Sequence, residues 1–158
     1  TALQPVCERL AAEMEALCSA SVLDGEDAVL VARAAPAQAG QIASGIGFRM
    51  PAFCSAGGRM LLSTLPDAAL DAWLERLEPR AQTVHTITDK PRLRDAILAA
   101  RADGYALVSE ETELGLRSIA ILVPGPVPAA LGIGLHVERG SREVLLGPCL
   151  ARLRAAIA

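Results

Sequence analysis

The residues best suited to binding chemistry lie in the stretch MPAFCSAGGRMLL, residues 50–62. Its second half is typical of a helix beginning near Ser55, yet Gly57 and Gly58 occupy the first turn, and glycine disfavours a helix by about 1 kcal/mol relative to alanine. First-turn N–H groups lack intrahelical partners and carry partial positive charge. Small residues there would leave those amides accessible, which predicts an anion site at Ala56 and Gly57. The alternative, equally supported, is close packing of the helix.

A second candidate feature is a face of small side chains on neighbouring predicted strands. Side chains alternate between the faces of a strand, so strands at 116–123 and 129–137 would each present one bulky face and one small face. The small face carries Ser118, Ala120, Ala130, Gly132 and Gly134. Gly45 and Gly47 would share a face of a further strand at 41–50. Since protein interiors leave few voids, this face must meet a closely approaching helix or a ligand, and we favour a ligand cavity.

Each polar residue near this predicted cavity could have a ligand-binding role or a structural one. Arg49 could pair with a carboxylate in a bidentate manner, or be solvated at a strand end. His136 shares the small face and could contact a ligand hydroxyl, or lie at the rim. Cys54 precedes the anion-site helix, where a thiolate would be stabilised, but a nucleophile needs a base within reach. Because His85 is not obviously placed to be that base, we predict no catalytic residue.

Other charged and sulfur-containing residues are interpreted as structural. Glu110, Glu111 and Glu113 are expected in a solvated loop, with Glu113 pairing locally with Arg117. The cysteines are scattered without a C-x-x-C pair, which predicts free thiols in a reducing cytoplasm, no metal site and no cofactor. They are Cys7, Cys18, Cys54 and Cys149.

The elements that must position these residues follow from hydrophobic periodicity. Helices are predicted at 3–20, at 55–64, from Pro66 to Leu77, from Thr88 or Asp89 to Gly104, and from Ser141 onwards, with Pro148 kinking or restarting the last one. Strands are predicted at 21–34, as a hairpin turning at Asp24-Gly25, and at 41–50, 105–109, 116–123 and 129–137. The order of helices and strands indicates an α+β domain with a mostly antiparallel sheet flanked by helices.

Composition narrows the class of protein. The chain has 158 residues, which fits a single domain spanning 1–158, and its hydrophobic fraction of 52% with 21% charged residues excludes disorder. A net charge of −3 argues against a nucleic-acid surface. The longest uncharged run, 118–135, is interrupted by prolines and glycines, so no membrane-spanning helix is expected. No signal peptide is visible, and the start at Thr1 suggests a piece of a longer chain.

Several motifs resemble the effector-binding domain of the IclR (isocitrate lyase regulator) family of bacterial transcription regulators. The matching pieces are MPAFCSAGGRMLL (50–62), Gly104-Tyr105, Glu110, GLRSIA (115–120) and AALGI (129–133). They cover essentially the whole chain in the right order. The segments VLDGEDAVLVARA (22–34), HTITD (85–89) and GYALVSEETELGLRSIA (104–120) are most similar to the branch of PcaR-, PcaU- and PobR-type aromatic-acid regulators.

The resemblance implies a GAF-like (profilin-like) fold with a curved, mostly antiparallel sheet and helices on both sides. It implies a small carboxylic acid effector whose carboxylate meets the amides of Ala56 and Gly57. Family members that sense small acids have a cysteine where this chain has Ser118, serines where it has Gly132 and Gly134, and an aspartate where it has Ser109 or Val108. These departures remove polarity or volume and favour a larger effector, such as an aromatic or long-chain acid.

The resemblance also implies a winged helix-turn-helix domain that precedes this chain in the full protein and carries DNA binding. It further implies a homodimer or homotetramer in the cytoplasm, and no enzymatic activity. The predicted ligand-binding residues are Ser55, Ala56, Gly57, Ser118, Ala120, Gly132, Gly134, Gly45, Gly47, Arg49, Ser109 and His136. Two alternatives remain: an oligomerisation module with a vestigial pocket, and an enzyme using Cys54 or Ser55 as nucleophile.

Overall fold

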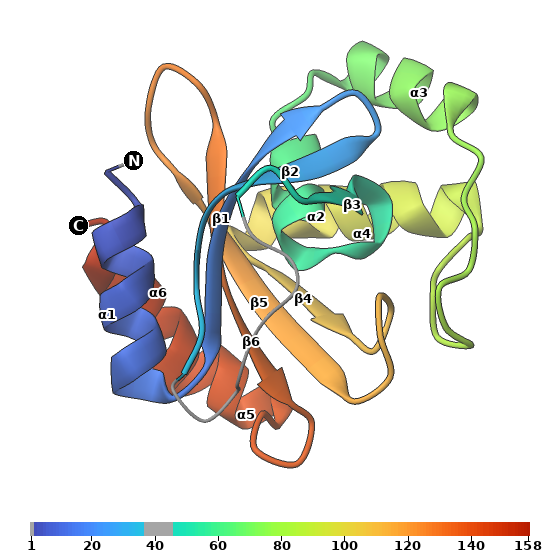
Figure 1. The fold of residues 1–158 in the computed structure, drawn as a ribbon. Coiled ribbons are helices and arrows are strands. Elements are labelled where there is room, and N and C mark those ends of the chain that lie inside the picture. Colours follow the sequence, from blue (N-terminus) through green and yellow to red (C-terminus); the bar gives the residue numbers. More distant parts are fainter. Residues whose placement is uncertain (1, 37–45) are drawn as a thin grey trace.

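The structure, a computed structural model, describes residues 2–36 and 46–158 and contains one curled antiparallel sheet (Figure 1). The six strands lie in the order β3-β2-β1-β6-β5-β4. Their bounds are β1 Leu17–Asp24, β2 Asp27–Ala34, β3 Arg49–Pro51, β4 Ala106–Ser109, β5 Leu116–Val123 and β6 Ala129–His136. β1 and β6 are antiparallel neighbours although they lie far apart in the sequence, so the first hairpin joins the last one at the centre of the sheet.

Helices cover both faces of this sheet, which confirms the predicted α+β class with a curled antiparallel sheet. The helices are α1 Gln4–Met14, α2 Ala56–Leu62, α3 Asp67–Arg76, α4 Lys90–Asp103, α5 Arg142–Val144 and α6 Leu150–Ala156. Figure 1 shows α1, α5 and α6 on one side of the sheet, and α2, α3 and α4 on the other. We call the first side the outer face and the second the inner face.

Two hydrophobic clusters correspond to these faces. The outer cluster joins α1 and α6 to the bulky sides of the strands, for example Ile119, Leu131 and Ile133, each at most 1% exposed. The inner cluster joins α2, α3 and α4 to small residues such as Ala120 and Ala130. Bulky side chains therefore fill the space under the outer helices, whereas on the inner face α2 lies close to the strands.

Local sequence signals place the bounds of α4, the first hairpin turn and the interruption of the last helix where the sequence predicts them. The Asp89 carboxylate accepts a hydrogen bond from the Arg92 N–H at the start of α4, and Gly104 ends that helix in the left-handed region at φ 78°. The hairpin turns at Gly25, as predicted, with φ 63°. Pro148 lies in a π-helical turn between α5 and α6, which confirms an interruption of the last helix.

Two predicted boundaries are wrong. The helix predicted at 3–20 ends at Met14, because Glu15 adopts a left-handed conformation at φ 50°, and Leu17 already begins β1. The strand predicted at 41–50 lies partly outside the described residues, and its described part becomes a strand only at Arg49. Gly47 precedes that strand in a turn with φ 89°.

Candidate functional site

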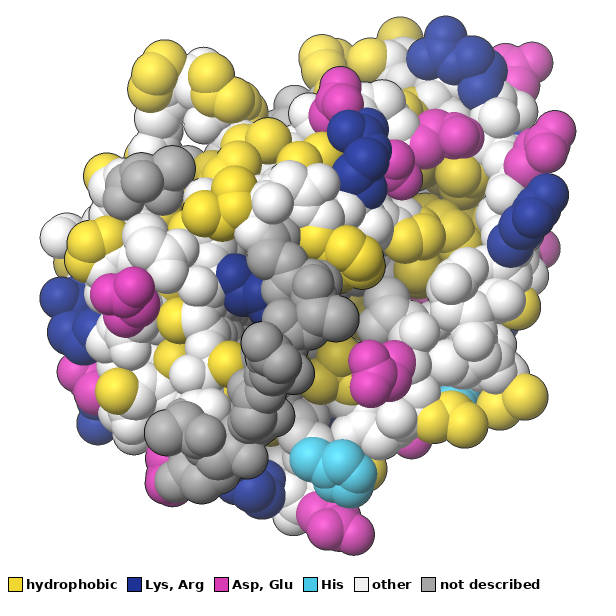
Figure 2. Space-filling view, in the orientation of Figure 1, with side chains coloured by type: hydrophobic (Ala, Val, Ile, Leu, Met, Phe, Trp, Pro, Cys, Tyr) yellow, Lys and Arg dark blue, Asp and Glu magenta, His cyan; other side chains and the backbone are white. Residues whose placement is uncertain are grey.

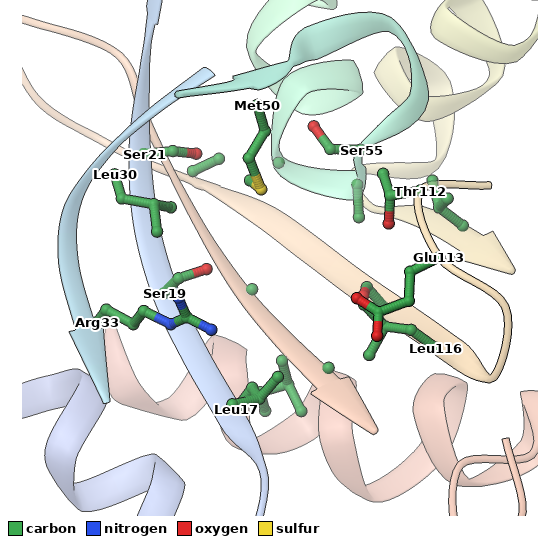
Figure 3. Close-up of a pocket in the computed structure, with 18 of the residues that line it drawn as sticks. Leu17, Ser19, Ser21, Leu30, Arg33, Met50, Ser55, Thr112, Glu113 and Leu116 are labelled. Carbon is green, nitrogen blue, oxygen red and sulfur yellow. The ribbon is translucent and has the colours of Figure 1, made fainter. Parts of the chain in front are cut away.

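A cavity of about 360 Å³ opens on the inner face between the strands and the start of α2 (Figure 3). Its size is within the range of about 300–1,000 Å³ that is usual for small-molecule sites. Leu17, Leu30 and Leu116 supply apolar walls. Hydroxyl groups of Ser19, Ser21, Ser55, Ser118 and Thr112 are distributed around it. The mixture suits an organic molecule with an apolar body and a few polar groups.

Glycines form the floor of the cavity, as the alternation of the strands predicts. Gly134 pairs with Ser118 across β5 and β6, and all three of Ser118, Gly132 and Gly134 line the cavity. A Cβ atom at Gly132 would lie 3.2 Å from the carbonyl oxygen of Ile119, and one at Gly134 would lie 3.3 Å from Ser118 Oγ. Glycine therefore both permits this strand geometry and leaves the floor flat.

The small-residue face meets a helix at one end and the cavity at the other. Ala120, which pairs with Gly132, is completely buried in the inner cluster, where α2 contacts β5, and it does not line the cavity. The two explanations offered for this face, close packing and a ligand site, thus each apply to part of it.

The start of α2 answers the question raised by its paired glycines. A Cβ atom at Gly58 would overlap the backbone of Ala52, so Gly58 is required by close packing. Gly57, together with Ser55 and Ala56, lines the cavity. The Ser55 hydroxyl caps the helix by accepting a hydrogen bond from the Gly58 N–H at 3.1 Å. The N–H groups of Ala56 and Gly57 lie in the first turn of α2, where a helix offers its N–H groups no backbone acceptor of its own.

Arg33 was not among the predicted site residues, yet it enters the cavity wall from β2 (Figure 3). The β1–β2 register pairs Ser19 with Arg33 and Ser21 with Leu30, so β2 has one extra residue, a β-bulge at Val31. Because of the bulge, Leu30 and Arg33 both face the cavity, although simple alternation places them on opposite faces. Burial lowers the pKa of the Arg33 guanidinium, which is partly withdrawn from solvent beside this apolar hollow.

Arg49 lines the cavity, but its guanidinium is held at the hairpin turn. It donates to Asp27 Oδ2 at 2.9 Å and to Asp24 Oδ2 at 2.8 Å. The hydrogen bond to Asp27, followed by the one to Asp24, raises the pKa of Arg49. The predicted role of Arg49 as a carboxylate clamp therefore competes with two carboxylates already in place.

Three other predicted site residues are not brought to the cavity. Gly47 has open space around it, and Ser109 accepts a hydrogen bond from Arg117 Nε at 3.0 Å. His136 is exposed at the end of β6, where its Nδ1 accepts from the Glu138 N–H. Gly45 lies outside the described residues.

The acidic loop was predicted to be solvated, and for Glu111 this is wrong. Glu111 is 6% exposed, and its carboxylate accepts two hydrogen bonds from Arg59, at 2.8 and 2.6 Å. Glu111 Oε1 also accepts from the Ile87 N–H at 3.0 Å. Glu113 is exposed, lines the cavity, and makes no ion pair with Arg117, which instead donates to Ser109 and to the Gly140 carbonyl.

The four cysteines are free, as predicted, and all four are buried. Burial, followed by the charge of Glu111, raises the pKa of the Cys54 thiol to about 11, while Arg59 partly opposes this shift. Cys54 is therefore a neutral core thiol at neutral pH, in contrast to an activated nucleophile. Within residues 2–36 and 46–158, no group of three acidic, histidine or cysteine side chains is arranged to hold a metal ion.

The comparison with protein-family models decides the family. Residues 1–157 match the model of the bacterial transcriptional regulator IclR C-terminal domain. The chain belongs to the IclR family. The match confirms the resemblance seen in the motifs, and it places the chain among transcription regulators and not among enzymes.

Individual IclR-family relatives give the same result. The Pca regulon regulatory protein of Pseudomonas putida is 34% identical over 157 residues, which cover 97% of this chain and 54% of that protein. The p-hydroxybenzoate hydroxylase transcriptional activator of Acinetobacter baylyi is 32% identical over 153 residues, covering 92% and 56%. The chain thus spans about half the length of these curated relatives.

A solved structure with the same fold is the inducer-binding domain of the PobR transcription factor from Acinetobacter, a double mutant in complex with 3-hydroxybenzoic acid. It superposes with a TM-score of 0.90 at 31% identity, covering 99% of this chain and 93% of that one. The branch of aromatic-acid regulators predicted from the sequence is therefore represented among both the relatives and the structures.

The surface properties fit the predicted class. Among the described residues, none of the helices is long and apolar enough to cross a membrane. Figure 2 shows basic and acidic side chains interspersed over one face of the molecule, without a continuous basic patch. Among the described residues of that face, no continuous basic surface typical of DNA binding is present.

Proposed function

We propose that this chain is the effector-binding domain of an IclR-type transcription regulator and that its cavity binds a small aromatic carboxylic acid. The observation that carries the proposal is the glycine-floored cavity on the inner face, with Arg33 in its wall. The flat floor at Gly132 and Gly134 suits a planar ring, and the leucine walls suit its apolar edges. The PobR domain, solved with 3-hydroxybenzoic acid, supports the same ligand class.

Two groups are suited to receive the carboxylate of such an acid. The first-turn amides of Ala56 and Gly57 are the predicted anchor. The guanidinium of Arg33 is a stronger one, since it carries a full positive charge and can form two parallel hydrogen bonds with a carboxylate. The proposed ligand-contacting residues are therefore Arg33, Ala56, Gly57, Gly132 and Gly134.

The regulatory part of the proposal concerns regions that this chain does not include. We propose that a separate winged helix-turn-helix domain binds DNA, that the regulator works as a homodimer or homotetramer, and that it acts in the cytoplasm. Effector binding would alter DNA affinity only if the two states of the regulator bind the acid with different affinities.

A binding experiment on a cavity-filling variant tests the proposed site. Benzoate and hydroxybenzoates are titrated by calorimetry into the wild-type chain and into Ser19→Leu, whose larger side chain would occupy the hollow beside Arg33. When an acid that binds is present at 100 times its dissociation constant, it should raise the free energy of unfolding of the wild type by about 2.7 kcal/mol, which a thermal melt detects. We expect binding to the wild type and its loss in Ser19→Leu.

The control is Ser141→Ala, which removes a hydroxyl outside the cavity, where Ser141 caps α5. It should weaken the fold slightly and leave acid affinity unchanged. Lack of binding by any acid in the wild type would contradict the sensor and support an oligomerisation module. Equal binding by Ser19→Leu would place the site elsewhere.

A further inference from the structure

The walls of the cavity carry opposite charges. Arg33 enters from β2, and Glu113 enters from the loop between β4 and β5 on the other side of the glycine floor (Figure 3). Among the described residues that line the cavity, Glu113 is the one carboxylate. A ligand lying between these walls therefore meets a cation at one end and a hydrogen-bond acceptor at the other.

The backbone of the turn that carries Glu113 is held by hydrogen bonds. Two residues earlier, Glu111 is clamped by Arg59 through two hydrogen bonds. The Glu113 carbonyl accepts from the Leu116 N–H, and the Gly115 N–H donates to Glu110 Oε1 at 3.0 Å. The carboxylate thus projects from a braced turn, and its approach to the cavity does not depend on a loosely held loop.

We propose that Glu113 determines specificity by accepting a hydrogen bond from a hydroxyl group on the effector ring, while the effector carboxylate lies at Arg33. This inference rests on the proposed function and adds the orientation of the effector in the cavity and a residue that determines its specificity. Glu113 would repel a carboxylate placed beside it, near Ser55 and Thr112 (Figure 3). A phenolic hydroxyl, which stays protonated near neutral pH, satisfies the same carboxylate.

Matched ligand pairs measure this contact directly. The 158-residue chain is titrated with 3- and 4-hydroxybenzoate and with 3- and 4-fluorobenzoate, which have similar shapes and no donor. The readout is the ratio of the dissociation constants of the fluoro and hydroxy acids at each ring position. Because a hydrogen bond to a charged acceptor is strong, we expect about a tenfold preference for the hydroxyl at one position or both.

The variant Glu113→Gln should change the two ligands in opposite directions. The hydroxybenzoate loses a charged acceptor and binds more weakly. The fluorobenzoate loses repulsion between its carboxylate and Glu113 and binds as tightly as before or more tightly. The ratio should fall to about threefold or less. A merely structural role for Glu113 would weaken both acids equally.

Glu138→Gln is the matched control, because Glu138 is an exposed carboxylate outside the cavity. It should keep the wild-type ratio. A ratio near one in the wild type, or a ratio that Glu113→Gln leaves intact, would overturn the role of Glu113 while benzoate binding still upheld the sensor. A complete lack of binding would overturn both.

Discussion

Arg59 and Arg33 show two uses of an arginine on the same side of one sheet. Arg59 is enclosed: its side chain is 5% exposed, and its guanidinium donates to both carboxylate oxygens of Glu111 and to the Phe53 carbonyl at 3.0 Å. Arg33 lies in the wall of a hollow, with Glu113 on the far side. Glu111 and Glu113 are two residues apart, yet one completes the interior and the other borders the cavity. Two neighbouring acidic residues and two arginines are thus divided between stabilising the fold and lining the cavity.

The largest effect is expected from breaking the enclosed pair. Arg59→Met leaves the Glu111 carboxylate buried without its cation, which should lower the free energy of unfolding by about 3–5 kcal/mol. Urea denaturation measures this loss. The double variant Arg59→Met/Glu111→Leu should recover much of it, because no uncompensated charge remains. Arg94→Gln, in an exposed ion pair with Asp71, should cost less than about 1 kcal/mol. Similar losses of stability for Arg59→Met and Arg94→Gln would contradict the structural role of the enclosed pair.

Changing Arg33 should affect the affinity for an acid more than the stability of the fold. Arg33→Met retains an apolar stem of similar length and removes the charge. We expect the affinity for benzoate to fall by about ten- to a hundredfold, measured by calorimetry, while stability changes much less than in Arg59→Met. Retained affinity would assign the carboxylate to the amides of Ala56 and Gly57.

The pH dependence of stability offers a smaller test of the enclosed region, through Cys54. Its thiol has a folded-state pKa of about 11, above the value of about 8.5 expected in an unfolded chain. The raised pKa contributes stability that is complete below about pH 8.5 and is lost as the pH rises toward 11. The loss should be roughly 1 kcal/mol per pH unit in this window.

Cys54→Ala separates this contribution from other high-pH effects. Urea midpoints at pH 8 and pH 10.5 should differ less in the variant than in the wild type. Identical pH dependence in both chains would show that Cys54 ionises as easily in the folded state as in the unfolded one. Acid binding at pH 8 should be unaffected, since Cys54 does not line the cavity.

Features set by local chemistry could be predicted from the sequence. The turn at Gly25, the helix between Asp89 and Gly104, and the small face of β5 and β6 all follow from nearest-neighbour rules. The floor of the site was therefore visible as Gly132 and Gly134. Even the start of α2 was identified, although only the structure shows that Gly58 serves packing and Gly57 borders the cavity.

The missed features depend on contacts between distant residues. Glu111 is buried because Arg59, 52 positions earlier, reaches it, and nothing in the acidic run itself distinguishes Glu111 from Glu113. The first helix was predicted to reach residue 20 because Leu17 fits the spacing of a helix as well as that of a strand, whereas the helix ends at Met14, before the left-handed Glu15. Arg33 was missed since a bulge is recognised only when both strands are aligned.

The register of β2 has an evolutionary consequence. The bulge absorbs Val31, so deleting this residue would leave Leu30 and Arg33 two positions apart and both still on the cavity face. An insertion between Ala32 and Arg33 would instead pair the new residue with Ser19 and turn Arg33 to the outer face, opposite Cys18. A single-codon insertion in this strand could therefore exchange a charged wall for an apolar one without replacing any amino acid. Relatives with identical pocket residues but a different strand length would then recognise different molecules.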